Sequence, residues 1–106
     1  MKKWRVLING TNFKMEMQED GRATRVRRMG FFTNVFVVAR TSRDAELQAV
    51  AALQQDQSLR KGLRNTKDDP PVLFAGEIQE IRSFRGCRRP RMGLVLYGER
   101  GPRRKK

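Results

Sequence analysis

The sequence predicts an α+β domain with the element order β-β-α-β-β, in which one main helix packs on one face of a four-stranded, largely antiparallel sheet. Three observations lead to this prediction. The chain has 106 residues, the length of a single domain. Apolar residues recur at helical spacing over one long stretch only, residues 42–55. Strand-like apolar runs occupy residues 3–17, 30–40, 72–81 and 93–99.

The first strand-like run has an irregular centre. Its alternating apolar positions are Trp4, Val6, Ile8, Phe13, Met15 and Met17. Asn9-Gly10 between them suits a type I′ hairpin turn, because both residues tolerate positive φ. The alternative is one long bent strand with a bulge at Gly10. Thr11 and Asn12 make the irregular part longer than a tight turn, which favours the bent strand.

The second strand-like run is the most apolar part of the chain. It follows a turn at Glu19-Asp20-Gly21 and a polar stretch, Arg22–Arg28. Its two faces carry Phe31, Val35, Val37 and Ala39 and, opposite them, Phe32, Phe36 and Val38. A strand with apolar residues on both sides is covered on both faces. Because one helix covers only one face, we expect a second copy of the chain to cover the other in a homodimer.

The helix is predicted to begin with Ser42 as its N-cap. Asp44 and Glu46 then lie in the first turn, where the helix dipole favours negative charge. Asp56 is expected to cap a further short turn that carries Leu59 and Leu63. The helical region ends before Asp68-Asp69-Pro70-Pro71, since proline has no backbone N–H and cannot continue a helix.

The last two strands enclose a basic loop. Gly76 marks a bulge or bend in the run 72–81. Residues 83–92 form a loop rich in arginine, and the run 93–99 supplies the last strand. The chain is therefore expected to form one domain over residues 1–99, followed by a basic tail, residues 100–106, with no apolar side chain to bury.

The net charge of +13 is the dominant feature of the composition, and it is unevenly distributed. Residues 31–81 carry six basic and seven acidic side chains. Residues 1–30 carry eight basic and three acidic side chains, and residues 82–106 carry ten and one. Such an excess attracts polyanions such as nucleic acid, or another acidic surface.

Eight arginines from the two basic segments are the candidate contacts. Guanidinium groups match phosphate geometry, and each phosphate contact releases counterions. The eight would form one patch if both segments lie at the same end of the sheet, which spacing along the chain does not decide. The alternative is a solvated surface whose charge only confers solubility. The candidates are Arg25, Arg27, Arg28, Arg82, Arg85, Arg88, Arg89 and Arg91.

Several short motifs together resemble a group of short bacterial proteins of unknown function. The motifs are Asn12-Phe13, Gly30-Phe31-Phe32-Thr33, Val37-Val38-Ala39, Ser42 with Ala45-Glu46, Asp56 with Leu59, Pro70-Pro71 and Glu77-Ile78-Gln79-Glu80-Ile81. The resemblance covers about residues 5–81 and implies a compact fold of helices and strands. It implies no activity, and the arginine-rich loop and tail depart from it.

The residue types that catalysis and metal binding need are scarce. Without histidine and with one cysteine, the chain has no Ser–His or Cys–His pair, no internal disulfide and no common zinc cluster. Cys87 lies among arginines without a base or a second cysteine nearby. Asp68-Asp69 and the pair Glu77 and Glu80 lack supporting ligands. We therefore expect no enzymatic activity, no cofactor and no metal.

Two further classes are not expected. The run from Gly30 to Phe36 resembles the aromatic strand of RNA-recognition domains, but Met29, Phe32, Thr33 and Asn34 occupy positions where that motif has other residues. We expect its phenylalanines to be core residues. No apolar run approaches the ~20 residues of a membrane helix, and residues 1–9 are too weakly apolar for a signal peptide. The sequence thus predicts a cytoplasmic protein.

Two functions are favoured over a third, a small enzyme that would depend on carboxylates alone or on carboxylates with a metal. The first is a non-enzymatic module that binds nucleic acid, or another polyanion, through arginine and lysine with little base specificity. The second is a homodimeric protein-interaction or structural protein whose positive charge is incidental.

Overall fold

The structure is a computed structural model that describes the backbone of residues 1–19, 23–89 and 91–99. It describes the side chains of residues 1–16, 25–89 and 91–99. The predicted turn at residues 20–21 and the predicted basic tail, residues 100–106, lie outside the described residues.

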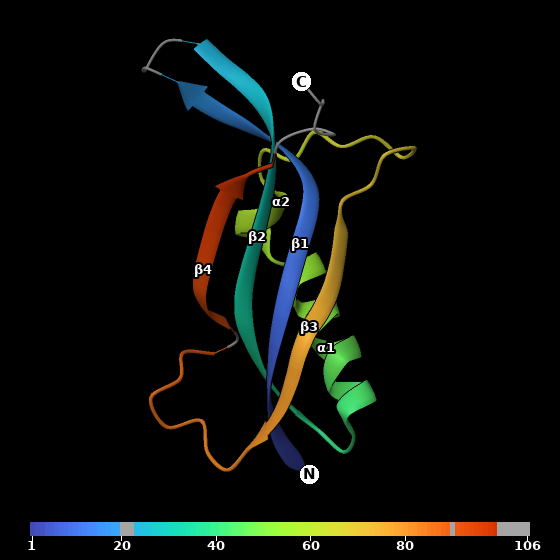
Figure 1. The fold of residues 1–106 in the computed structure, drawn as a ribbon, viewed down its shortest axis with the longest axis vertical. Coiled ribbons are helices and arrows are strands. Elements are labelled where there is room, and N and C mark those ends of the chain that lie inside the picture. Colours follow the sequence, from blue (N-terminus) through green and yellow to red (C-terminus); the bar gives the residue numbers. More distant parts are fainter. Residues whose placement is uncertain (20–22, 90, 100–106) are drawn as a thin grey trace, which may run out of the picture.

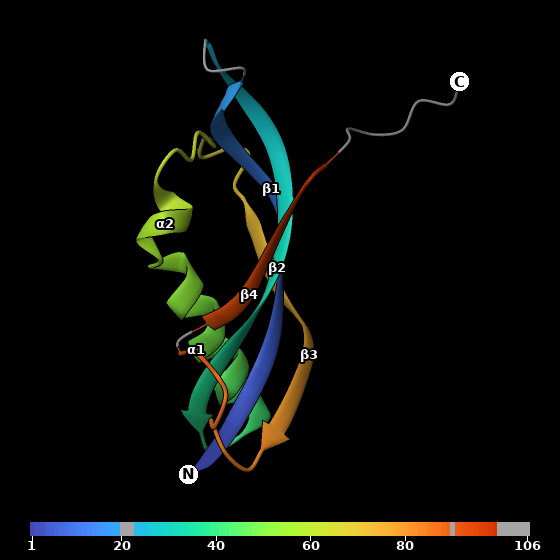
Figure 2. The same ribbon diagram turned by 90° about the vertical axis from the view of Figure 1, so that its left-hand side faces the viewer.

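The predicted fold class is confirmed. Four antiparallel strands form one sheet in the order β3-β1-β2-β4, and α1 covers one face of it (Figures 1 and 2). The short helix α2, at the predicted further turn, follows α1 on the same side of the sheet. The elements are β1 (Lys2–Glu19), β2 (Ala23–Ala39), α1 (Ser42–Gln54), α2 (Gln57–Arg60), β3 (Val72–Ile81) and β4 (Arg91–Gly98).

β1 is one long bent strand, as the sequence favoured. Its pairing with β2 shifts between Gly10 and Phe13, so Thr11 and Asn12 form the bulge rather than Gly10 itself. Asn12 has a φ of 57°, and its side chain donates to Asp69 Oδ1 at 2.8 Å and to the Pro70 carbonyl at 3.1 Å. The bend in β1 is therefore held by the segment that precedes β3.

The polar stretch before the apolar run is part of β2, which corrects the boundary drawn from the sequence. Residues 23–28 pair with residues 14–19 of β1, beyond the ends of β3 and β4 (Figure 1). We call this two-stranded extension, residues 14–19 and 23–28, the arm. Backbone pairing to β1 and not apolar content makes it a strand, so the period-two pattern could not locate it.

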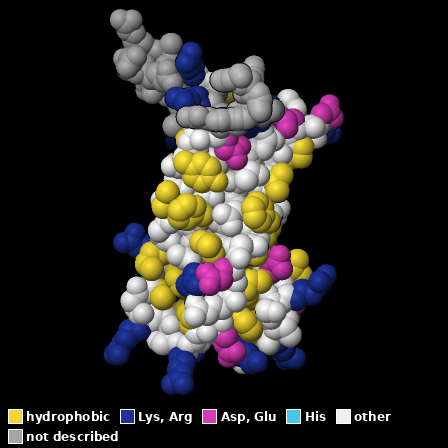
Figure 3. Space-filling model, in the orientation of Figure 1, with side chains coloured by type: hydrophobic (Ala, Val, Ile, Leu, Met, Phe, Trp, Pro, Cys, Tyr) yellow, Lys and Arg dark blue, Asp and Glu magenta, His cyan; other side chains and the backbone are white. Residues whose placement is uncertain are grey.

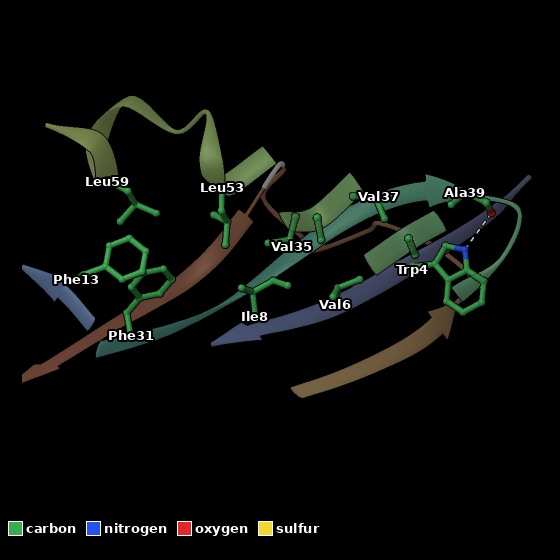
Figure 4. Packing of buried hydrophobic residues seen from close by; sticks show 12 residues of the cluster. Trp4, Val6, Ile8, Phe13, Phe31, Val35, Val37, Ala39, Leu53 and Leu59 are labelled. Atoms are coloured by element: carbon green, nitrogen blue, oxygen red, sulfur yellow. Dashed lines mark hydrogen bonds between the residues drawn. The ribbon is translucent and has the colours of Figure 1, made fainter. Parts of the chain in front are cut away.

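The core lies between the helices and the sheet (Figure 4). Val6, Ile8, Phe31 and Val35 are completely buried, and their side chains face Ala45, Ala49, Leu53 and Leu59 of the helices. Trp4 closes one end of this core, where its Nε1 donates a 3.0 Å hydrogen bond to the Ala39 carbonyl. Burial of this cluster fixes which face of β1 and β2 points to the helices.

The helix caps refine the predictions. Thr41 is the N-cap of α1, because its Oγ1 accepts from Asp44 N at 3.1 Å, so the predicted cap at Ser42 was one residue late. Asp56 caps α2 as predicted, accepting from Ser58 N at 2.9 Å.

The sheet face turned away from α1 is here called the open face (Figure 3). Phe32, Phe74, Met92, Val95 and Tyr97 lie on it and are all exposed. The two-sided apolar pattern of β2 is correct, but Phe32 is 39% exposed and is not a core residue as expected. On this side of β2, the Phe84 ring contacts the Phe36 ring edge to face.

Candidate polyanion-binding surface

The eight arginines predicted from the sequence do not form one patch. Arg25, Arg27 and Arg28 lie on the arm, at one end of the long axis. The loop between β3 and β4 carries Arg82, Arg85, Arg88 and Arg89 at the opposite end (Figure 1). β1 and β2 are joined at one end of the sheet, and β3 and β4 are joined at the opposite end. The two groups of arginines are therefore separated by the length of the sheet.

The arm arginines take part in interactions within the chain. Arg28 Nε lies 3.5 Å from Glu99 Oε1, and Glu99 also accepts a 3.0 Å hydrogen bond from the backbone N–H of Asn12. Arg25 and Arg27 are exposed and also have partners. Part of the charge on the arm is therefore already used in holding the bend of β1.

Arg91 serves the fold. It is the first residue of β4, and its Nε donates to Asp56 Oδ2 at 2.7 Å while its Nη2 donates to Ser58 Oγ at 3.1 Å. Burial by itself would raise the pKa of the Asp56 carboxyl, but the hydrogen bonds from Arg91 and Ser58 and the charge of Arg91 bring that pKa below its ordinary value. Arg91 therefore ties the edge strand to the cap of α2.

The β3–β4 loop is anchored on the open face. The Phe84 ring meets the buried Phe36 ring edge to face, with centroids 6.3 Å apart. The Arg89 guanidinium lies 4.3 Å from the centre of the Phe84 ring, a cation–π contact. The Cys87 backbone N–H donates to the Phe84 carbonyl at 2.8 Å, which closes a turn around Gly86 at a φ of +79°. The loop thus presents its arginines from a fixed base.

Four further cations lie at the same end of the sheet as the loop, and sequence reasoning missed them. Lys2 pairs with Ala39 and Lys3 with Ile81, so the start of β1 lies between the end of β2 and the end of β3. Arg40 follows β2 directly, and Arg43 lies in the first turn of α1 at the same end. We call this surface the basic end; its members are Lys2, Lys3, Arg40, Arg43, Arg82, Arg85, Arg88 and Arg89. Each of the four missed residues lies at or next to the end of a strand or helix. Only knowledge of which strand ends are neighbours in the sheet could have placed them together.

The charge at the basic end is largely uncompensated. Three carboxylates lie near this end, Asp44 and Glu46 in the first turns of α1 and Glu80 beside the end of β3. Lys2 lies 4.0 Å from Glu80 in an exposed ion pair. Within residues 1–16, 25–89 and 91–99, no carboxylate lies within ion-pair distance of Arg40, Arg43, Arg82, Arg85 or Arg88. Dark blue side chains accordingly gather at the lower end of the molecule in Figure 3.

The other candidate groups are the carboxylates near β3 and Cys87 of the β3–β4 loop. No cluster of three or more histidine, cysteine or acidic side chains is placed to hold a metal in the described part of the chain. Asp69 is engaged with Lys14 and with Asn12, whose hydrogen bonds lower the pKa of its carboxyl below the ordinary value. Cys87 is a half-buried free thiol in the loop. A cavity beside α1 and α2 is lined mainly by Phe13, Leu53, Leu59, Leu63 and Leu73 and lies away from the basic end.

Among the described helices, neither α1 nor α2 has the length and apolarity that crossing a bilayer requires.

Comparisons with protein-family models, with curated proteins and with solved structures give no match. The resemblance to short bacterial proteins therefore stays a prediction, and the proposed function rests on the residues themselves.

Proposed function

We propose that this protein is a non-enzymatic module that binds nucleic acid through the phosphate backbone at the basic end. The observation that carries the proposal is the convergence of eight lysine and arginine side chains, against three carboxylates, at one end of the sheet. Phosphates neutralised by such side chains release counterions, which supplies affinity without base readout.

The anchored loop adds to this support. Arginines on a mobile chain lose conformational entropy when they bind, whereas a pre-formed loop has already lost much of it. Packing of Phe84 on Phe36 and the turn around Gly86 restrict the loop before any ligand is bound. The loop is therefore suited to contact several phosphates at once.

The test is a titration with fluorescently labelled single- and double-stranded oligonucleotides at salt concentrations from about 50 to 200 mM, where phosphate contacts weaken steeply. Two variants that remove the same charge are compared. The loop triple changes Arg82, Arg85 and Arg88 to Gln. The control triple changes Arg60, Lys61 and Lys67 to Gln, three exposed cations outside the basic end.

The proposal predicts that the loop triple weakens binding and lowers the slope of log affinity against log salt by about one for each lost contact, whereas the control triple leaves both nearly unchanged. A chain ending at Glu99 keeps its affinity. Equal effects of the two triples, or no binding at about 50 mM salt, would overturn the proposal, since phosphate contacts are strongest there.

A second candidate function is a homodimeric interaction protein with incidental charge. The observation that favours it is the open face, on which five large apolar side chains are exposed. Exposed apolar surface of this kind marks interaction sites. Sedimentation equilibrium would test it, because a sheet-to-sheet dimer predicts twice the mass of the chain and dissociation when Phe32 and Val95 are changed to Lys.

A further inference from the structure

The open face carries a row of side chains that crosses all four strands. Asn9 of β1 pairs with Phe74 of β3 on one side and with Phe32 of β2 on the other, and Phe32 pairs with Val95 of β4. Neighbouring strands lie about 4.8 Å apart, which puts the Cα atoms of the two phenylalanines about 10 Å apart. The shorter Asn9 side chain therefore lies between two exposed rings.

The amide of Asn9 is without a hydrogen-bond partner among residues 1–16, 25–89 and 91–99. Its Nδ2 atom lies over Gly76, where an added Cβ would come within 2.5 Å of it. The flanking rings of Phe32 and Phe74 are 39% and 46% exposed. A half-buried amide that is not engaged by the described residues and lies between two exposed rings offers both hydrogen bonds and stacking surfaces.

A third ring extends the platform. Tyr97 pairs with Gly30, and its ring covers that glycine, since a Cβ on Gly30 would lie 2.5 Å from the Tyr97 Cε1 atom. The ring lies against the sheet, and 41% of the residue is exposed. Tyr97 and Phe32 lie on the same face, two positions apart along β2 through Gly30.

The charges around the face favour a polyanion over a second copy of the chain. At the centre of the face, Arg5 forms an ion pair with Glu77 at 3.1 Å and donates a hydrogen bond to Asn34 Oδ1 at 2.7 Å. On the side toward the basic end, Phe36 of the open face contacts Phe84, and the Arg89 guanidinium lies over the Phe84 ring. The open face is therefore continuous with the basic end. Two copies stacked face to face would bring chains of charge +13 together, with uncompensated cations beside the interface.

We infer that the open face binds the bases of single-stranded nucleic acid, which stack on Phe32, Phe74 and Tyr97 and hydrogen-bond to Asn9, while the phosphates contact the basic end. The inference rests on the proposed function and adds the ligand class, a single strand. In a duplex the bases are paired and stacked on each other, so only unpaired bases reach the rings.

The experiment compares a labelled single-stranded decamer with the same sequence in a duplex, using fluorescence anisotropy. In the variant Phe32→Leu with Phe74→Leu, the face stays apolar and the rings are lost. The control is Leu47→Ala, which changes an exposed apolar residue of α1 on the far side of the sheet. Stacking contributes enough per base that the double variant should weaken single-strand binding between about 5- and 150-fold. Duplex binding should change less than about twofold.

Each outcome has a separate meaning. Loss confined to the single strand supports the inference, and equal loss for both ligands or no loss for either overturns it. Dissociation of a dimer by the double variant, with no change in single-strand preference, also overturns it and assigns the face to a second copy. If the proposed function itself is wrong, neither ligand shows salt-dependent binding to the unaltered chain, and this result distinguishes the two failures.

A second readout does not depend on folding of the variants. The unaltered chain is cross-linked by ultraviolet light to a decamer containing 5-iodouridine, and the attached residues are identified by mass spectrometry. Cross-links at Phe32, Phe74 or Tyr97 support the inference. Cross-links found only at the basic end or on the arm overturn it.

Discussion

Arg91 Nε donates a 2.7 Å hydrogen bond to Asp56 Oδ2, which joins the first residue of β4 to the residue that caps α2. Both side chains are mostly buried, at 22% and 17% exposure. Ser58 completes the group, because its backbone N–H and its hydroxyl both donate to the other carboxylate oxygen. An edge strand is thus held to the helical layer by a hydrogen-bonded ion pair.

The first prediction concerns the stability that this pair contributes. Changing Arg91 to Gln removes the charged donor and leaves the partly buried Asp56 carboxylate with fewer partners. We expect a loss of about 1.5–3 kcal/mol in the free energy of unfolding. Urea unfolding followed by the fluorescence of Trp4, the only tryptophan, measures it.

Arg88→Gln is the control for this prediction, because Arg88 is exposed and outside any ion pair among the described residues. A loss of the same size in both variants would contradict the structural role of Arg91. The effects on nucleic-acid affinity should be the reverse of those on stability, because Arg88→Gln is the variant that weakens binding.

The second prediction concerns acid stability. The folded pKa of Asp56 lies below its ordinary value of 3.8, so the folded state favours the ionised form. Such a carboxyl stabilises the fold fully above its unfolded pKa, and the contribution is lost as the pH falls through the folded pKa. We therefore expect stability to decline from about pH 5 downward, and Asp56→Asn to make the decline shallower.

Unfolding free energies measured between pH 2 and pH 7 check this expectation. Asp44→Asn is the matched control, since that carboxyl is exposed and forms no ion pair with the described residues. An equally steep decline in the Asp56→Asn variant would contradict the assignment.

The sequence predicts the sheet and the helix well because both depend on periodic burial. The alternation of Trp4, Val6 and Ile8 marks the core face of β1, and the spacing of Ala45, Ala49 and Leu53 marks that of α1. The extent of β2 was missed because residues 23–28 are held by backbone pairing, which any polar residue can supply.

The candidate site was predicted only in part. The order of strands in the sheet decides which arginines share a surface, and composition carries no information on that order. The structure separates Arg25 from Arg85 and brings Lys3 beside Arg82 through pairing of β1 with β3. Arg91 shows that charge type alone does not distinguish a binding side chain from one that holds the fold together.

The third prediction concerns close packing at Gly10. An added Cβ would lie 2.4 Å from Phe31 Cε2 and 2.9 Å from Phe13 Cε1, two buried rings that meet edge to face at 4.9 Å. Neither ring can move without disturbing the core. We expect Gly10→Ala to cost about 1–3 kcal/mol of unfolding free energy, as overpacked cores do.

Gly98→Ala provides the comparison in β4, because the nearest atom to its added Cβ is Arg27 Nη2 at 3.9 Å. Urea unfolding of both variants isolates the steric effect, since each loses the same backbone freedom in the unfolded chain. Equal stability of the two would show that the core at Phe31 yields more easily than the packing implies.

The last prediction separates the shape of the basic loop from its charge. Phe84→Ala keeps every cation but removes the ring that rests on Phe36 and carries the Arg89 guanidinium. The loop then has to be ordered on binding, at a cost of about 0.5–1.5 kcal/mol for each side chain immobilised. We expect nucleic-acid affinity to fall between about 2- and 15-fold, with the salt slope unchanged because the same number of phosphates is neutralised. Phe84→Tyr should retain the affinity of the unaltered chain, since it keeps the ring. An unchanged affinity in Phe84→Ala would mean that charge alone determines binding, and a reduced salt slope would mean that the loop arginines no longer reach the phosphates.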